Sequence, residues 1–391
     1  MGEWKEYKLG DLVIGNKGSY GIAASAVDYD INKYTYLRIT DIKDDGTINK
    51  TSLKSVDDIN AKNYILHSND IVFARTGASV GRSYFYEEKD GVLIYAGFLI
   101  KFSIDSQKVN PKLLKYYTHS QPYYDWIQTV DNGATRGNIN AQTYASMPIL
   151  LPERMEQDKI VNILSSLDDK IDLLHRENET LEAMAETLFR KWFIEDAKDE
   201  QSETILGDVV ETTSGGTPSR KNEKYYQNGT IDWVKSKELN GTFLLETEEK
   251  ITEDAVANSS AKFIPANSVL IAMYGATVGE NAIIAKEMTC NQAICALIPN
   301  ENYPYTYLFL WAKLMKEEFI NLACGAAQQN ISQVLIKQQQ VCSDIDAVKQ
   351  FHSTTEPLFN KIKQNEIQLS SLKDIKNMIL PKLMNNESIN E

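Results

Sequence analysis

Cysteine and histidine are scarce in this sequence of 391 residues, which contains four of each. The cysteines are Cys290, Cys295, Cys324 and Cys342, and the histidines are His67, His119, His175 and His352. No Cys-x-x-Cys pair occurs, although structural zinc sites and small disulfide frameworks both need clustered ligands. The sequence therefore predicts no metal site and no disulfide framework, and the expected location is a reducing cytoplasm.

Long apolar runs are also absent. No stretch approaches the roughly 18 consecutive apolar residues that a membrane-spanning helix needs. The first eight residues, MGEWKEYK, contain no apolar core of a secretory signal. With 42% hydrophobic residues and only 10 prolines, the composition is that of a soluble globular protein, and the length suggests two or three domains.

Catalytic motifs are likewise missing. The sequence has no Gly-x-Gly-x-x-Gly, no Asn-Pro-Pro-aromatic methylation loop and no recognisable nucleophile pair. The stretch 77–83, GASVGRS, resembles a phosphate-binding loop, but it is one residue short and lacks the lysine. A related stretch, 275–281, has Glu280 where a basic residue would stand. A glycine turn is therefore the preferred interpretation, and the chain is expected to bind rather than to catalyse.

Positive charge is in deficit, because 41 lysines and arginines stand against 54 acidic residues, for a net charge of −13. This balance argues against a simple DNA binder, which would present a basic surface. Residues 1–152 nevertheless hold 17 basic and 17 acidic residues. Any contact with nucleic acid is therefore expected to be local, or to be helped by a basic partner.

The sequence does contain an uninterrupted helical seam between residues 153 and 193. Its members recur at alternating steps of four and three residues, which is the spacing of a coiled coil. A helix of some 40 residues would be roughly 60 Å long, too long for the core of a compact domain. The seam consists of Ile160, Leu164, Leu167, Ile171, Leu174, Asn178, Leu181, Ala185, Leu188 and Trp192.

A second ladder lies 191 residues further along the chain. It consists of Phe351, Thr355, Leu358, Ile362, Asn365, Leu369, Leu372, Lys376, Ile379 and Leu383. If the two helices pack antiparallel with Asn178 opposite Asn365, every seam residue meets a seam partner, including Trp192 with Phe351. The sequence therefore predicts an antiparallel coiled coil whose two asparagines face each other and fix the register. The alternative is two amphipathic helices, each packed on its own domain.

Three further segments recur in the same order. Leu9–Val13 recurs as Leu206–Val210, Asn69–Gly81 as Asn267–Gly279, and Gly133–Ile139 as Gly325–Ile331. Their offsets of 197, 198 and 192 residues lie close to that of the helices, which indicates a tandem duplication. The predicted fold class is α+β. Two similar mixed α/β domains, residues 1–152 and 197–343, are separated by two long helices, residues 153–196 and 344–391, packed as an antiparallel coiled coil.

Within the first domain the pattern predicts strands at Asp70–Arg75, Arg82–Tyr86 and Tyr95–Phe102, with the glycine turn between the first two. It predicts a helix over Pro111–Val130, with a counterpart at Pro304–Ala323.

These residues resemble one family closely, the specificity subunits of type I restriction–modification systems. In the first long helix the resemblance is carried by Asp158–Asp172 and Asn178–Phe193. In the second half it is carried by Gly215–Arg220, Ile231–Leu239, Glu248–Thr252 and Asn258–Lys262, whereas the first domain lacks a Gly-Gly-Thr-Pro stretch.

The resemblance implies a non-catalytic subunit that recognises DNA sequence. Each globular half would be a target-recognition domain for one half of a split site in double-stranded DNA. The two helices would act as a ruler and would bind two modification (methyltransferase) subunits, which restriction (motor and nuclease) subunits can join. S-adenosylmethionine, ATP and Mg²⁺ would belong to those partners, so that no cofactor and no membrane contact is expected for this chain.

Base reading needs donors and acceptors that reach a groove edge, whereas phosphate contacts only position the protein. The polar residues of the glycine turns and nearby loops are the predicted DNA-binding positions: Arg75, Thr76, Arg82, Tyr84, Arg136, Asn138, Arg220, Lys221, Lys235, Ser236, Lys237, Tyr274, Gln328, Gln329 and Asn330. Asn138 and Asn330 have the alternative of bonding within their own loops, since both copies carry them at the same place. Phe189 and Phe193 lie off the seam, and each is predicted to contact either a modification subunit or a domain of the same chain.

Two other functions stay open at this point. One is an adaptor with two ligand-binding domains on a coiled-coil spacer, which the acidic charge favours. The other is an enzyme, which would need a site that the sequence does not reveal.

Overall fold

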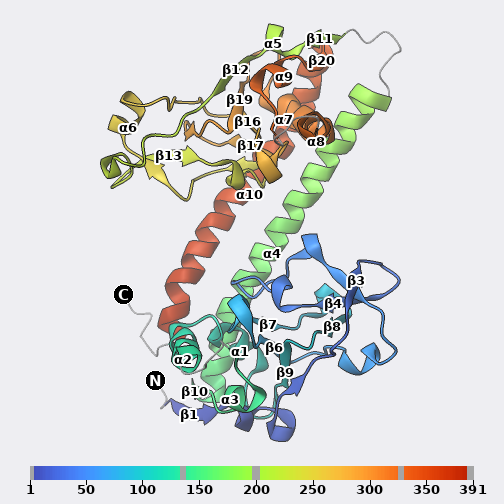
Figure 1. The fold of residues 1–391 in the computed structure, drawn as a ribbon, viewed down its shortest axis with the longest axis vertical. Helices are drawn as coiled ribbons and strands as arrows, with labels where there is room; N and C mark the ends of the chain where they lie inside the picture. The colour runs from blue at the N-terminus through green and yellow to red at the C-terminus, as the bar shows by residue number, and fades with distance from the viewer. Residues whose placement is uncertain (1–3, 133–137, 196–202, 325–329, 385–391) are drawn as a thin grey trace. The chain divides into compact units, whose positions relative to one another are not determined.

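The computed structural model describes residues 4–132, 138–195, 203–324 and 330–384. The chain divides into two compact units (Figure 1). Unit 1 comprises residues 1–170 and 372–391, and unit 2 comprises residues 171–371. Each unit therefore includes a segment of both long helices.

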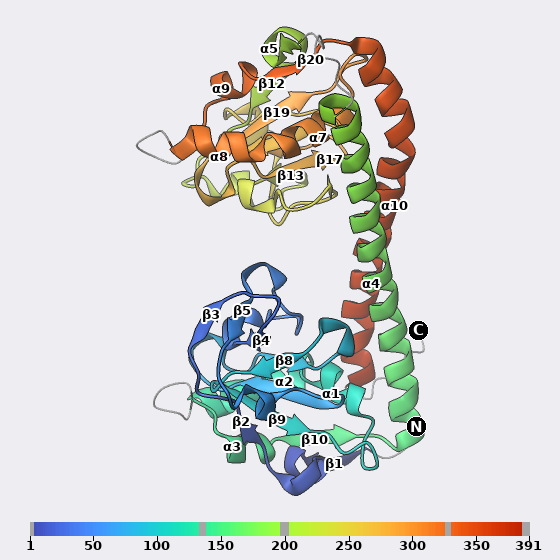
Figure 2. The ribbon, with the colours of Figure 1, turned by 90° about the vertical axis from the view of Figure 1, so that its right-hand side faces the viewer.

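The two long helices pair as the heptad spacing predicts (Figures 1 and 2). Helix α4 spans Arg154–Arg190 and continues as a π-helical turn, Lys191–Glu195, and α10 spans Ile345–Met384. No residue of either predicted seam is exposed. In unit 2 the ring centroids of Trp192 and Phe351 lie 5.8 Å apart, as expected for antiparallel pairing.

The two asparagines meet as predicted. Asn365 Nδ2 donates to Asn178 Oδ1 at 2.8 Å, and both side chains are buried. Asn178 Nδ2 also donates to Glu366 at 2.7 Å, and Asn365 Nδ2 donates to Glu177 at 3.0 Å. Because a one-heptad slip would leave these polar groups facing apolar seam residues, the pair specifies a single register.

Unit 1 contains two four-stranded sheets, β2-β9-β6-β7 and β3-β5-β4-β8, and the two-stranded sheet β1-β10. Its strands are β1 (Lys5–Lys8), β2 (Ser19–Tyr20), β3 (Ala26–Asp28), β4 (Tyr34–Leu37), β5 (Lys54–Val56), β6 (Asp70–Ala74), β7 (Ser83–Phe85), β8 (Leu93–Tyr95), β9 (Leu99–Ser103) and β10 (Pro148–Leu151). Its short helices are α1 (Pro111–Tyr117), α2 (Gln121–Asn132) and α3 (Ala141–Ala145).

Unit 2 repeats this arrangement. Its sheets are β12-β19-β16-β17-β14, β15-β13-β18 and β11-β20. Its strands are β11 (Glu203–Ile205), β12 (Glu211–Ser214), β13 (Ile231–Val234), β14 (Phe243–Leu244), β15 (Lys250–Ile251), β16 (Val269–Ala272), β17 (Asn281–Ile284), β18 (Thr289–Cys290), β19 (Ile294–Ile298) and β20 (Gln340–Cys342). Its helices are α5 (Leu206–Val209), α6 (Glu253–Ala257), α7 (Tyr305–Leu314), α8 (Lys316–Cys324) and α9 (Gln333–Lys337).

One inner strand of each unit contributes to two cores: β6 of the sheet β2-β9-β6-β7 and β16 of the sheet β12-β19-β16-β17-β14. In β6, Ile71 and Phe73 join the core that includes α1 and the helix ends, whereas Val72 and Ala74 join the core between the two sheets. Side chains alternate across a strand, so a continuous apolar run is buried on both faces. Strand β16 divides its residues between two cores in the same way.

The helix predicted over Pro111–Val130 is in fact two helices, α1 and α2, and its counterpart is divided into α7 and α8. Asn110 caps α1 by accepting from the N–H of Lys112. After Tyr117 the hydroxyl of Ser120 donates back to the Tyr117 carbonyl at 2.7 Å. Pro122 lies in the first turn of α2, where its missing N–H costs nothing, whereas in a continuous helix it would break the backbone ladder.

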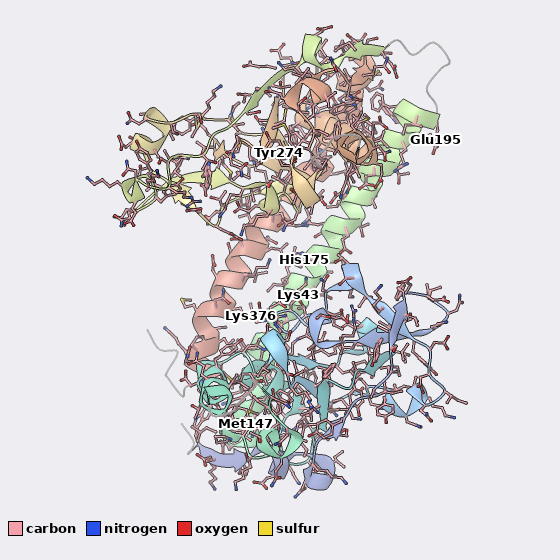
Figure 3. The ribbon with its side chains drawn as sticks, in the orientation of Figure 1. Lys43, Met147, His175, Glu195, Tyr274 and Lys376 are labelled. Carbon is pink, nitrogen blue, oxygen red and sulfur yellow. The ribbon has the colours of Figure 1, made fainter. Side chains whose placement is uncertain are left out.

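A half-buried ion network fixes α1 on both long helices within unit 1. Asp168 of α4 accepts from Lys376 of α10 at 2.6 Å, and it lies 3.0 Å from Lys115 of α1. The Tyr116 hydroxyl donates to the same carboxylate at 3.1 Å. Lys376, labelled in Figure 3, thus finds a charged partner at a seam position that would otherwise be apolar.

The asparagine pair leads to a test of register. Asn365→Leu removes the donor to Asn178 and leaves a buried amide oxygen unpaired, so the free energy of unfolding should fall by about 1–3 kcal/mol. Asn178→Leu combined with Asn365→Leu should unfold at a higher temperature than the single variant, because both polar groups are then gone. Thermal unfolding measures both, and a single variant as stable as wild type would contradict the role given to the pair.

The ion network leads to a test by pH. Burial raises the pKa of Asp168, but the charges of Lys115 and Lys376 outweigh burial and hold the pKa below its ordinary 3.8. A lowered folded-state pKa means that the stabilisation is present above the unfolded-state value and is lost as the pH falls through the folded-state value. Asp168→Asn should therefore lower the free energy of unfolding at neutral pH by about 2–3 kcal/mol.

The difference from wild type should shrink as the pH falls below about 4, the ordinary range of an aspartate in an unfolded chain, because the wild type then loses this stabilisation. Denaturant unfolding at neutral and acid pH measures it. Asp169→Asn, which changes the exposed neighbouring carboxylate, is the matched control and should leave stability nearly unchanged. A pH-independent loss in Asp168→Asn would refute the electrostatic explanation.

Candidate nucleic-acid interface

Each unit holds one glycine turn between two neighbouring strands of one sheet, β2-β9-β6-β7 in unit 1 and β12-β19-β16-β17-β14 in unit 2. The first turn, residues 75–82, joins β6 to β7, and the second turn, residues 273–280, joins β16 to β17. Gly77 and Gly275 have φ angles of 70° and 67°, which side chains with a Cβ rarely adopt. The turn interpretation of these stretches therefore replaces the phosphate-loop alternative.

The same backbone hydrogen bonds position the two turns. The N–H of Ile139 donates to the carbonyl of Arg75, and the N–H of Ile331 donates to that of Met273, both at 2.9 Å. The neighbouring pairs, Thr76 with Asn138 and Tyr274 with Asn330, form antiparallel bridges. Each turn is thus joined to a distant segment at an equivalent place, and the main chains of both asparagines take part in these bridges.

In each unit one glycine lies close against the backbone of another segment. Gly21 directly follows β2, and Gly215 directly follows β12. A Cβ on Gly21 would lie 2.2 Å from the carbonyl oxygen of Ala96, and one on Gly215 would lie 1.9 Å from that of Cys290. No side chain fits at either place. Gly21 therefore takes the structural position of Gly215, although the first domain lacks the Gly-Gly-Thr-Pro sequence.

Arg75 is the cation of the first turn that contacts an aromatic ring. Its guanidinium carbon lies 5.1 Å from the ring centroid of Tyr20, and its side chain is half-buried. Thr76 is also half-buried, whereas Asn138 is exposed. These three predicted positions come together at one edge of unit 1.

Arg82 and Tyr84 have other partners. Arg82 donates to Asp44 at 2.6 Å and to the Ile42 carbonyl at 3.2 Å. Tyr84 is only 3% exposed, and its hydroxyl donates to Asp90 at 2.9 Å. Burial and the nearby Asp90 carboxylate raise the pKa of Tyr84. The predicted DNA contact of Tyr84 is inconsistent with this burial, since β7 is covered on both faces.

In unit 2, Tyr274, which is labelled in Figure 3, is exposed near the start of the second glycine turn. The predicted cations lie in loops beside the three-stranded sheet β15-β13-β18, where acidic residues pair with them. The Arg220 guanidinium makes two hydrogen bonds with Glu249 and lies 4.1 Å from the Tyr226 ring centroid. The hydrogen bond from Arg220 holds the pKa of Glu249 below its ordinary value.

The two predicted lysines of this sheet are paired in the same way. Lys235 lies 3.3 Å from Glu249 and 3.7 Å from Glu248, and Lys237 lies 2.5 Å from Glu248. The basic residues of this surface are therefore largely neutralised by the Glu248–Glu249 pair. This pairing agrees with the acidic net charge and argues against binding by general electrostatic attraction.

Five predicted DNA-binding positions remain. Lys221 is exposed and Ser236 is half-buried at the start of a short 3₁₀ turn. Arg136, Gln328 and Gln329 lie outside the residues that the structure describes.

Phe189 does not face a partner. Its side chain is 3% exposed, and its ring lies 5.5 Å from Tyr307 and 5.6 Å from Phe351. The half-buried Phe193 ring packs against the same two rings. The prediction of a partner contact is wrong for Phe189, and the intramolecular alternative holds, because α7 and α10 cover this face of α4 within unit 2.

Two residues at these surfaces were missed from the sequence. Tyr20 contacts Arg75 from a strand far away in the chain, and no local pattern marks it. Arg38 is the counterpart of Lys235, since the backbone N–H of each donates to the carboxylate three residues on, Asp41 or Glu238. Aligning Tyr34–Asp41 with Ile231–Glu238 would have revealed Arg38.

Two kinds of site find no support in the described part of the chain. There, no group of three or more His, Cys, Asp or Glu side chains could hold a metal ion. None of the helices described is long and apolar enough to cross a membrane.

Comparison with known proteins gives a consistent result. A family model for the type I restriction modification DNA specificity domain matches residues 1–183 and 199–342. The specificity subunit of the type I restriction enzyme HindI of Haemophilus influenzae is 23% identical over 475 residues, covering 99% of this chain and 100% of the relative. The MjaIX specificity subunit of Methanocaldococcus jannaschii is 26% identical, covering 72% of this chain and 70% of the relative.

One solved structure shares the fold over nearly its whole length. The S subunit of a type I restriction–modification system from M. genitalium superimposes with a TM-score of 0.61 at 17% identity, covering 98% of this chain and 96% of that one.

The placement of Tyr84 leads to a test. Tyr84→Phe removes a buried hydrogen bond to a carboxylate, so the free energy of unfolding should fall by about 1–2 kcal/mol. Because the side chain does not reach the surface, the variant should keep its relative affinities for different DNA sequences. Chemical denaturation and binding to a panel of duplexes measure the two effects, and changed sequence preference at unchanged stability would restore Tyr84 as a contact.

Proposed function

Because the chain belongs to the type I restriction modification DNA specificity family, we propose that it reads a split site in double-stranded DNA, with one recognition surface in each unit. The chain would supply sequence recognition, and methyl transfer would be the work of modification subunits bound to it. S-adenosylmethionine, and ATP with Mg²⁺ where restriction subunits join, would then be bound by those partners.

One observation carries this proposal. The two units present equivalent turns, held by equivalent hydrogen bonds, but the side chains at these turns differ. Thr76 in the first unit stands where unit 2 has Tyr274, and Arg82 stands where unit 2 has Glu280. A shared framework with different surface groups is the design expected of two readers for two different half-sites.

The charge pattern supports recognition within a complex. Acidic side chains pair with Arg82, Arg220, Lys235 and Lys237, so few of the predicted cations can neutralise phosphates without exchanging partners. Phosphate contacts dominate the affinity of isolated DNA-binding proteins. A partner with basic surfaces would supply much of the affinity, and this chain would supply selectivity.

The long helices offer surfaces for such partners. Ile163, Leu173 and Met184 of α4 and Ile367, Ile375 and Met378 of α10 are exposed although they are apolar. Apolar residues on the outer faces of a helix pair are typical of sites that other subunits cover. We propose two modification subunits as those partners, one for each target-recognition domain. An adaptor without nucleic acid is not favoured, given the family to which the chain belongs.

Mapping of N6-methyladenine tests the proposal directly. DNA would be sequenced from cells that express this chain together with its modification subunit, the modification subunit alone, or neither. We expect a new methylated motif only with both proteins, made of two short specified blocks around an unspecified gap of fixed length. Methylation by the modification subunit alone at the same motif, or a motif with a single contiguous block, would refute the two-surface proposal.

A further inference from the structure

Two neighbouring positions beside the glycine turn carry different side chains in the two units. Tyr20 in β2 lies opposite Ile100 of β9, and Ser214 in β12 lies opposite Cys295 of β19, at the matching place in unit 2. The Arg75 guanidinium lies over the Tyr20 ring. The counterpart of Arg75 in unit 2 is Met273, which is buried in the core. Unit 1 therefore has an aromatic–cation pair where unit 2 has a serine and a core methionine.

Tyr20 is itself fixed in position. Its hydroxyl accepts the N–H of Ala141, at the start of α3, at 3.1 Å. The next residue, Gly21, lies against the Ala96 carbonyl, which prevents the strand from moving toward β8. The ring therefore offers a rigid surface beneath the Arg75 guanidinium.

Arg75 is pre-organised by these contacts. Its N–H donates to the Phe98 carbonyl at 3.1 Å, and its carbonyl accepts from Ile139. The Nε of its side chain is buried and has no hydrogen-bond partner among the residues that the structure describes. A guanidinium that is stacked on a ring and buried at its root loses less freedom on binding than a solvated one.

The edge where this pair lies is open to solvent. Tyr20 is 42% exposed and Phe98 is 58% exposed. Thr76 and Asn138, which bridge to each other, lie next to Arg75 in the backbone ladder. A ligand with a flat, hydrogen-bonding edge can therefore reach this part of unit 1.

We propose that Tyr20 is a positioning residue that presents Arg75 to a guanine in the half-site read by unit 1. This inference rests on the proposed function. The guanidinium fork matches the O6 and N7 acceptors of guanine in the major groove, and no other base offers two acceptors at that spacing. At the equivalent turn unit 2 has Ser214 and Met273 instead, so this contact is specific to unit 1.

Binding of the complete complex, this chain with its modification subunit, tests the inference. The affinity for a duplex with the cognate site, established by methylation mapping, is compared with affinities for duplexes that carry one replaced base pair each. Arg75→Ala should abolish a discrimination of about 5- to 150-fold at one G·C pair of one half-site. Tyr20→Ala should weaken discrimination at that same pair, whereas Tyr20→Phe, which keeps the ring, should retain most of it.

Two controls separate positioning from a loss of charge or fold. Lys62→Ala removes an exposed positive charge from the same unit and should leave the discrimination unchanged. Combining Tyr20→Ala with Arg75→Ala should lower discrimination no further than Arg75→Ala alone, since the tyrosine acts through the arginine. Thermal unfolding of each variant confirms that it is folded.

The outcomes distinguish the two proposals. A wild-type complex that prefers neither half-site over random DNA would refute the proposed function itself. A wild-type complex that reads both half-sites, with Tyr20→Ala reading them equally well, would refute only the inference. Loss of discrimination spread evenly over both half-sites in Tyr20→Ala would also overturn it, because the effect would then not act through one base contact.

Discussion

The hydrogen bond between Asn178 and Asn365 is the contact on which the rest of the structure depends. The two long helices carry similar apolar ladders, and leucine and isoleucine alone would tolerate several offsets between them. A buried amide pair tolerates one offset, because any other leaves two polar side chains without partners. With that register set, α10 supplies Leu380, Leu383 and Met384 to the core of unit 1, and Phe351, Phe359 and Ile362 to the core of unit 2. The core of unit 1 is therefore completed by a helix from the other end of the chain.

The duplicated domains show which features are structural and which differ between the copies. The glycine at the left-handed position, the close approach at Gly21 or Gly215, and the carbonyl of Arg75 or Met273 that holds the following segment occur in both units. These features are requirements of the backbone. The side chains at Tyr20, Arg75 and Thr76 have different counterparts in unit 2, so the backbone does not dictate them. Differences in the DNA sequence that each unit reads would arise at such positions.

Those parts of the structure that depend on residue spacing could be predicted from the sequence. The seam, the duplication and the glycine turn each follow from a local period or from a repeated string, and the asparagine pair follows from matching two such periods. Burial depends on what covers a residue. Tyr84 was predicted as a contact because it follows the turn, yet β7 is a strand covered on both faces. Phe189 was predicted to be available because it lies off the seam, but α7 and α10 occupy that side of α4.

Charge pairing was beyond sequence reasoning for a related cause. Arg220, Lys235 and Lys237 were identified as available cations, whereas Glu248 and Glu249 reach them from the bend that precedes β15. Tyr20 could not be connected with Arg75, since only the pairing of β2 with β9 and of β9 with β6 brings them together. The helix break after Tyr117 was missed, since one helix was predicted over Pro111–Val130, although Pro122 cannot continue the backbone ladder of α1.

The most direct test of two separate reading surfaces is site-specific photo-crosslinking from equivalent positions of the two turns. A photoreactive side chain would be placed at Thr76 or at Tyr274 in the complete complex, and the crosslinked nucleotides would be mapped on a duplex that contains the methylated motif. The account predicts that position 76 crosslinks to one specified block and position 274 to the other. Crosslinks from both positions to the same block, or to the unspecified gap alone, would contradict it.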